Sequence, residues 1–428
     1  MSHRSRAKRG GAARRHGVLA VLGIGLAAGL AACNLLEQET PDLIAADDLT
    51  DPSNADLLVR SAFSALECAL AQHVLGTGLL GDELDDASVS EPLWDYDRRT
   101  LNPARAQYAS GSCGSGVPTN YMDLSRARYQ ADFALRLLEG WTDEQVPNRV
   151  GLIAWAAAYG GYSLVMMAES FCSGAIDMGP ELSPADMFRE AIKRFDRAIE
   201  AGTAAGDTAT VTLARLGRAR ARLGLGDLEG AGADAALIPE GFVVNATYSD
   251  AATRRQNRVH TALYRTPIAT VSASYRNLTF DGVPDPRVEV IDAGRSGMDA
   301  DVPLFQPAKY GSVSSPIPLA TWEEAQLILA EARLAAGDTD GAVAIINRLH
   351  ERVGLPPYGG GTAEEVRAQI IEERRRELFL EGHRLGDMIR YGIPLDPPPG
   401  TPFRLGGLYG DQRCFPLPDI ERQNNPNL

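Results

Sequence analysis

The chain has 428 residues, with 42 Lys and Arg against 56 Asp and Glu, and a formal net charge of −14. So acidic a chain lacks the basic surface that neutralises phosphates, and we expect no nucleic-acid partner. The hydrophobic fraction of 44% is ordinary for a globular protein, and the length allows one large domain or two to three smaller ones.

Residues 1–32 have the layout of a secretory signal. The first half is basic without any acid, the second half is apolar and small, and Leu30-Ala31-Ala32 stands directly before Cys33. This order predicts an exported chain, and the cysteine after the small residues indicates lipidation at that thiol. The apolar run is too short for the roughly 20 residues of a membrane span. We therefore predict a lipoprotein signal peptide over 1–32, a tether over 33–45, and a chain anchored to a membrane.

Four cysteines follow Cys33, and none has the spacing of a zinc site, so we expect no metal. Export favours disulfides, and four cysteines allow three pairings that sequence alone does not resolve. We predict Cys68–Cys113, which closes a modest loop next to the first helix, and Cys172–Cys414, which ties the C-terminal tail to the helical body. Free buried thiols are the alternative.

The body of the chain has mostly helical patterns. Apolar periodicity begins after the capping sequence Asp51-Pro52-Ser53-Asn54. Further helices are expected over 120–139, 147–171, 184–201 and 208–225. Residues 76–118 and 239–320 are rich in Gly, Pro, Ser, Asn and Asp, which predicts long structured loops with minor strand content. Loops on a rigid scaffold often carry the binding site.

An internal repeat relates residues 214–239 to residues 327–356. Each copy has a helix with Ala/Leu spacing, a Gly-Asp turn, a second helix and a nearby Pro. The glycine suits the left-handed residue that ends a helix, and the aspartate caps the next one. This is the helix–turn–helix pattern of tetratricopeptide repeats, and the helices over 147–171 and 184–201 are a candidate third unit. Such units stack because none buries its apolar face alone.

Two motifs near residue 80 have alternative interpretations. Gly76–Gly81 matches G-x-G-x-x-G, but a helix precedes it and acids follow, so we interpret it as a helix end. The acids Asp82, Glu83, Asp85 and Asp86 could ligate calcium, although they lack EF-hand spacing and a solvated acidic loop is favoured. The chain has no G-x-S-x-G, H-E-x-x-H or P-loop, so we expect no catalytic residues and no cofactor.

The stretch Ile371–Gly392 is rich in arginine and glutamate at helical spacing. Its charges stand three or four residues apart, which predicts one helix that neutralises its own charge. The expected pairs are Glu372–Arg376, Glu381–Arg384 and His383–Asp387.

This stretch resembles a signature of the SusD/RagB family of outer-membrane nutrient-binding lipoproteins, E-R-R-R-E-L-x-x-E-G-x-R-x-x-D-x-x-R, from Glu373 through Arg390. Residues 414–428 (CFPLPDIERQNNPNL) resemble the terminal motif of the family, and Ala330–Asp338 resembles a third segment. Residues 239–320 match no family motif. The resemblance implies a mostly α fold: a single domain over 46–428, in which tetratricopeptide-like helical hairpins support an irregular, loop-rich binding face.

The resemblance also implies a function. Such a protein is lipid-anchored at the cell outer membrane, captures glycans or other nutrient oligomers such as peptides, and delivers them to a SusC-like TonB-dependent transporter, without catalysis. A structural lipoprotein that scaffolds another envelope protein is the alternative, and a surface glycoside hydrolase is a more distant one.

Sugar sites commonly combine aromatic faces with polar neighbours. The candidate ligand-binding residues, all in predicted loops, are Trp94, Tyr96, Tyr108, Tyr275 and Tyr310. The alternative is that each ring packs its loop against the body. Trp141, Trp155 and Trp322 lie at or near helical positions and are expected in the core.

Overall fold

The computed structural model describes residues 50–428, so the signal segment 1–32, Cys33 and the tether 33–45 lie outside the described residues. Residues Pro52–Leu428 form one compact unit. The helices are α3 (Ala55–Leu80), α4 (Glu91–Asp97), α5 (Asn120–Gly140), α6 (Arg149–Ser170), α7 (Pro184–Ala205), α8 (Thr208–Leu225), α9 (Leu228–Ala235), α10 (Arg258–His260), α11 (Trp322–Ala335), α12 (Thr339–Val353), α13 (Ala363–Glu377), α14 (Arg384–Tyr391) and α15 (Asp419–Asn424). The mostly α fold predicted from the sequence is confirmed.

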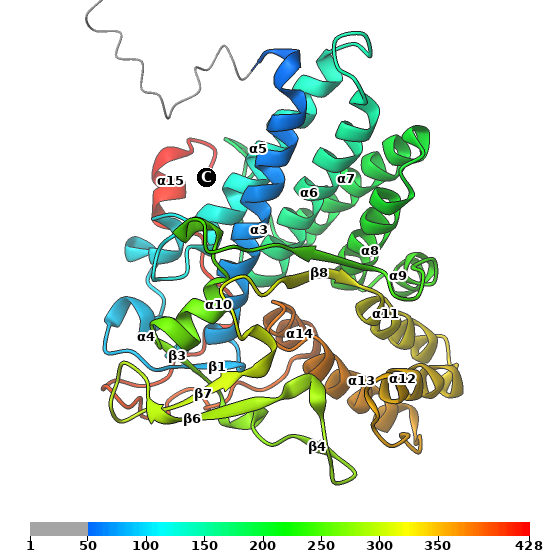
Figure 1. Ribbon diagram of the computed structural model, residues 1–428. Helices are drawn as coiled ribbons and strands as arrows, with labels where there is room; N and C mark the ends of the chain where they lie inside the picture. The colour runs from blue at the N-terminus through cyan, green and yellow to red at the C-terminus, as the bar shows by residue number, and fades with distance from the viewer. Residues whose placement is uncertain (1–49) are drawn as a thin grey trace, which may run out of the picture. The chain divides into compact units, whose positions relative to one another are not determined.

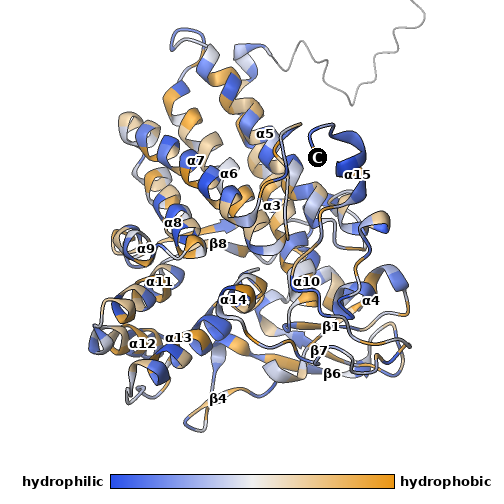
Figure 2. Cartoon of the chain, turned by 180° about the vertical axis from the view of Figure 1, so that it is seen from behind, coloured by the Kyte–Doolittle hydropathy of each residue, from blue (hydrophilic) through white to orange (hydrophobic). Residues whose placement is uncertain are grey.

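Helices α3, α5, α6, α7 and α8 pack against one another in chain order, and α6 also contacts α3 and α8 (Figure 1). Their facing sides are apolar, whereas α15 is strongly hydrophilic (Figure 2). Small residues bring the helices close together: a Cβ at Gly161 of α6 or Gly217 of α8 would lie 2.6 or 2.4 Å from the Phe195 ring of α7. Helix α6 is long and apolar enough to cross a membrane, but 89% of its most apolar window is buried inside the protein.

The predicted repeat is confirmed as two helical hairpins, α8–α9 and α11–α12, and α9 packs against α11. Gly226 and Gly337 take the left-handed φ values of +78° and +81° in the two turns. Asp227 and Asp338 then accept hydrogen bonds from backbone amides three residues later, at 3.0 and 2.9 Å. The same local chemistry therefore builds both turns.

The two regions predicted as loops contain more regular structure than expected. Helix α3 runs through Gly76 and Gly78 and ends at Leu80, with Gly81 as its C-cap, so the G-x-G-x-x-G motif is a helix end, as interpreted. Glu91–Asp97 is a helix rather than a polar loop.

Short antiparallel pairs β1–β3, β2–β8, β4–β5 and β6–β7 account for the strand content. The strands are β1 (Leu84–Asp86), β2 (Val243–Ala246), β3 (Ala269–Val271), β4 (Thr279–Phe280), β5 (Val283–Pro284), β6 (Val290–Ser296), β7 (Pro303–Pro307) and β8 (Ile317–Thr321).

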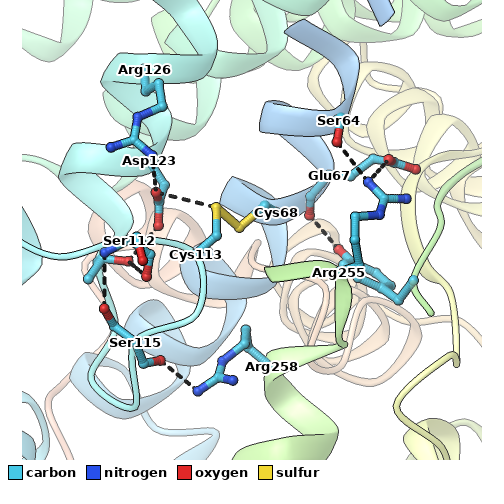
Figure 3. The surroundings of a disulfide bond; sticks show 12 residues. Ser64, Glu67, Cys68, Ser112, Cys113, Ser115, Asp123, Arg126, Arg255 and Arg258 are labelled. Atoms are coloured by element: carbon cyan, nitrogen blue, oxygen red, sulfur yellow. Dashed lines mark hydrogen bonds and ion pairs between the residues drawn. A yellow bond between two sulfur atoms is a disulfide. The ribbon is translucent and has the colours of Figure 1, made fainter. Parts of the chain in front are cut away.

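Both predicted disulfides form. Cys68 on α3 bonds Cys113, with 5.8 Å between the Cα atoms, and Cys172 bonds Cys414 across 242 residues of sequence, with 5.1 Å between theirs. Figure 3 shows Asp123 of α5 beside the first disulfide. Within residues 50–428, these two cysteines and Asp123 form the one group with metal-binding atoms close together, and the sulfur–sulfur bond removes both thiolate ligands.

Candidate functional site

The arginine-rich signature is two helices and not the single helix predicted. Helix α13 ends at Glu377, and α14 begins at Arg384. Between them Leu380 and Gly382 take left-handed φ values of +54° and +86°. A Cβ at Gly382 would lie 2.7 Å from the His73 ring, so glycine allows the turn to approach α3. Helical spacing continues through the turn, which is why the sequence pattern hid the break.

The break gives the charged side chains partners outside the segment. The predicted pair Glu381–Arg384 is wrong: Glu381 accepts a hydrogen bond from Lys309 Nζ at 2.5 Å. Arg384 instead donates to both carboxylate oxygens of Asp82, at 2.8 and 2.6 Å. Both interactions hold the turn against segments that are far away in the sequence.

The predicted pair His383–Asp387 is also wrong. Asp387 binds Arg374 Nε at 2.8 Å and Arg390 Nη2 at 3.0 Å, and it is 7% exposed. Arg390 continues the chain of charges to Glu331 of α11, at 2.5 and 3.0 Å. Burial alone would raise the pKa of Asp387, but the charges of Arg374 and Arg390 bring that pKa below its ordinary value.

The third predicted pair is confirmed, since Arg376 Nε donates to Glu372 Oε1 at 2.7 Å. Arg376 also reaches Asp285 at 3.2 Å, and Arg287 binds both Asp285 and Glu373, at 2.7 and 2.6 Å. Region 239–320, which matches no family motif, therefore supplies buried partners to the signature.

The acidic residues 82–86 are not the solvated loop that was favoured. Glu83, 1% exposed, accepts a hydrogen bond from the Leu380 amide at 2.7 Å, and burial raises its pKa to about 8. Asp86 is hydrogen-bonded by Arg404 and Ser88. These carboxylates already have protein donors and belong to the interior at β1.

Four of the five aromatic candidates are buried, and this corrects the expectation that they stack on a ligand. Each ring is 0% exposed, and each hydroxyl is hydrogen-bonded within the protein. Tyr96 donates to Pro118 O at 2.6 Å, Tyr108 to Pro416 O at 2.8 Å, Tyr275 to Asp82 at 3.2 Å and Tyr310 to Leu380 O at 2.9 Å. These rings pack loops onto the body, the alternative given for them, because a buried phenol needs both an apolar setting and an acceptor.

Trp94, the fifth candidate, is partly exposed on α4, with its ring 6.4 Å from that of Phe403. It remains a candidate for ligand contact at the loop-rich face. Of the tryptophans expected in the core, Trp322 is 2% exposed, while Trp141 and Trp155 are partly buried against the core.

A groove of about 900 Å³, the arginine groove, was missed by sequence reasoning. It is lined from α6, α7, α8, α9, α11, α13 and α14, and the Cys172–Cys414 disulfide forms part of its wall. Its lining arginines are Arg189, Arg220, Arg367, Arg374, Arg390 and Arg413. The signal was present in the arginine-rich signature, but those charges were assigned to pairing within one helix.

Comparison with known proteins identifies the fold and the C-terminal segment. The sequence model of the SusD family matches residues 324–428, which include α13, α14 and the C-terminal tail. Over residues 324–428, the chain is therefore similar to the SusD family. Similar solved structures include a SusD-like carbohydrate binding protein from Bacteroides vulgatus (16% identity, TM-score 0.63, covering 88% of this chain and 97% of that one).

A SusD superfamily protein from Parabacteroides distasonis is also similar (14% identity, TM-score 0.68, 88% of this chain and 98% of that one). So is a laminarin binding SusD-like protein (14% identity, TM-score 0.63, 88% and 99%). At these identities the structures show a shared fold. No curated protein matches the sequence. The segment matched by the SusD family model includes α13 and α14, which form one wall of the arginine groove.

Proposed function

We propose that this SusD-like protein captures nutrient oligomers, glycans first among them, in the arginine groove, and passes them to a SusC-like TonB-dependent transporter. The groove carries the proposal, because its volume of about 900 Å³ lies within the range of ligand sites. The shared fold with a carbohydrate binding and a laminarin binding SusD-like protein supports glycans as the cargo.

The chemistry of the groove suits a sugar chain. Ile389 offers exposed apolar surface to C–H faces in a groove that the buried residues Phe188 and Leu223 also line, while Tyr391 and the arginines offer hydrogen-bond donors. Ile389 is 43% exposed although it is a large apolar residue, so a ligand in the groove has apolar area to cover.

The groove is suited to binding rather than hydrolysis. A glycosidase needs two carboxyl groups, one of them available as an acid. The carboxylates lining the groove are Glu169, Glu331 and Asp387, and each is hydrogen-bonded by an arginine. Release of product from a labelled glycan would contradict this part of the proposal.

Isothermal titration with a panel of oligosaccharides tests capture. We expect Ile389→Ala to weaken binding roughly fivefold, because truncation removes about 1 kcal/mol of apolar contact. Ile420→Ala is the matched control, since Ile420 is 52% exposed on α15, outside the groove. If Trp94→Ala weakens binding while Ile389→Ala does not, the site lies on the loop-rich face and the groove assignment fails.

Anchoring and delivery need a separate test. The proposed lipid attachment is at Cys33, so Cys33→Ser should release the protein from the membrane fraction. A pull-down of the lipidated protein from membranes should bring a TonB-dependent transporter barrel with it. Recovery of a different envelope protein in place of a barrel would favour a scaffolding lipoprotein.

A further inference from the structure

The arginine groove has more positive than negative side chains in its lining, six arginines against three carboxylates. Each of its three lining carboxylates is already hydrogen-bonded by an arginine of the same groove. The pairs are Glu169 with Arg220 at 2.5 and 2.7 Å, Glu331 with Arg390 at 2.5 and 3.0 Å, and Asp387 with Arg374 at 2.8 Å. All of the negative charge in the groove is therefore compensated before any ligand arrives.

Three further arginines line the groove. Arg189 pairs with Asp186, which is not part of the lining, and both side chains are about half exposed (61% and 48%). Arg413 donates to the carbonyl of Ile393 at 2.7 Å, and Arg367 lies 5.5 Å from the centre of the Tyr391 ring. Within residues 50–428, neither Arg367 nor Arg413 forms an ion pair with a carboxylate, so their charge is uncompensated at the groove.

A buried donor adds to this surplus. Arg374 lines the groove with a side chain that is 4% exposed, and its Nη1 finds no hydrogen-bond partner among the described residues. A buried guanidinium nitrogen without an acceptor is unfavourable, because it has lost its hydrogen bonds to water. The groove thus combines surplus positive charge with an unused donor.

From this geometry we infer that the arginine groove selects oligosaccharides that carry carboxylates, such as chains of uronic acids, over neutral ones. The inference rests on the proposed function and names its substrate class. Guanidinium groups bind carboxylates through paired, charge-assisted hydrogen bonds. The groove has a surplus of positive side chains on a chain whose formal net charge is −14, so it attracts an anion that the chain as a whole would repel. The exposed side chain of Ile389, which lines the same groove, suits the C–H face of a sugar ring that bears a carboxylate.

The test compares tetragalacturonate with its methyl ester, which has the same sugar skeleton without the charges. Titration uses the full mature chain in detergent micelles. We expect tetragalacturonate to bind at least about tenfold more tightly at roughly 50 mM salt, and this advantage to shrink as salt screens the charges. The double variant Arg367→Gln/Arg413→Gln should abolish most of the difference.

The matched control is Arg60→Gln/Arg333→Gln, which removes the same charge from exposed positions outside the groove, 64% and 46% exposed. It should retain the preference for the acid. Thermal unfolding of both variants establishes that each is folded before affinity is compared.

The outcomes separate the inference from the proposed function. If the ester binds as tightly as the acid and the groove arginines have no effect, the charge inference is overturned while capture of glycans stands. If a tetraglutamate peptide binds as tightly as tetragalacturonate, the assignment to sugars is overturned. If no oligosaccharide of the panel binds, the proposed function fails as well.

Discussion

The hairpin α11–α12 and the segment α13–α14 follow one another in the chain, yet they satisfy their charged groups in opposite ways. In the hairpin, Asp338 caps α12 through the Gly341 amide and pairs with Arg333, and all three residues lie within nine residues of chain. In the segment, Arg374 and Arg390 converge on Asp387, and Arg390 crosses to Glu331 in α11.

Burial differs in the same way. The Arg333–Asp338 pair is half exposed, 46% and 47%, whereas Arg287 and Glu373 are 5% and 0% exposed. An exposed pair exchanges its partner for water at little cost, while a buried charge that loses its partner has no replacement. The charged side chains of the hairpin therefore pair locally and can exchange their partners for water. The charged side chains of the signature pair with residues far away in the sequence and depend on those partners.

The sharpest test of this difference is Arg287→Met. The change leaves three carboxylates, Asp285, Glu373 and Glu377, without their shared arginine. We expect the free energy of unfolding to fall by about 3–5 kcal/mol, measured by urea denaturation. Arg333→Met in the hairpin should cost at most about 1 kcal/mol. Equal losses for the two variants would remove the distinction between the regions.

The disulfides extend the comparison to the tail. Cys172–Cys414 spans 242 residues and joins the residues after α6 to the tail beyond α14, while Cys68–Cys113 spans 45. A cross-link restricts the unfolded chain more when it closes a longer loop, so removing the first should cost about 1.5 kcal/mol more than removing the second. Urea unfolding of the two double-serine variants measures this difference, and a larger loss at Cys68–Cys113 would contradict it.

Glu83 accepts a hydrogen bond from the turn between α13 and α14, so the pH dependence of stability tests this contact. Burial raises its folded pKa from 4.5 to about 8, so the folded protein holds a proton that the unfolded chain releases between those values. The contribution of Glu83 to stability therefore falls as pH rises through this window, by up to about 1.4 kcal/mol per pH unit. Glu83→Gln keeps the acceptor for the Leu380 amide and removes the titration.

We expect the Gln variant to gain stability relative to the parent between pH 4.5 and 8, in urea unfolding at several pH values. Glu365→Gln is the control of opposite sign. Hydrogen bonds from Thr362 lower the pKa of Glu365. The contribution of Glu365 to folding stability is therefore present above pH 4.5 and is lost as pH falls below it. A stability difference between the parent and Glu83→Gln that stays constant from pH 4.5 to 8 would contradict the raised pKa of Glu83.

The smallest expected effect lies in the hairpin turns. Asp227→Ala and Asp338→Ala each remove one helix cap, and we expect a loss of about 1 kcal/mol for each in thermal or urea unfolding. Because the two turns have the same chemistry, the losses should agree to within about 0.5 kcal/mol. A loss as large as that of Arg287→Met would mean that the hairpins, too, depend on long-range partners.

Much of the candidate site was beyond sequence reasoning. Tyr96 and Tyr310 have polar neighbours in the sequence, but their burial depends on Pro118 and Leu380, which are far from them along the chain. The groove likewise needs Arg220 of α8 and Arg413 of the tail to meet α14. The spacing of residues within one segment does not predict which distant segments will contact it in the fold.

The sequence by itself determined the repeated hairpins and the resemblance of the C-terminal segment to the SusD family, because each depends on local chemistry or on a few distinctive residues. Which cysteines pair was decided by the tertiary structure. The Gly-Asp turn at Gly337 and Asp338 supplies its own left-handed residue and its own cap. Tertiary structure decided the break at Leu380, the partners of the signature arginines and the existence of the groove. A buried charge takes whichever opposite charge the packing brings to it, and helical periodicity within one segment does not encode that choice.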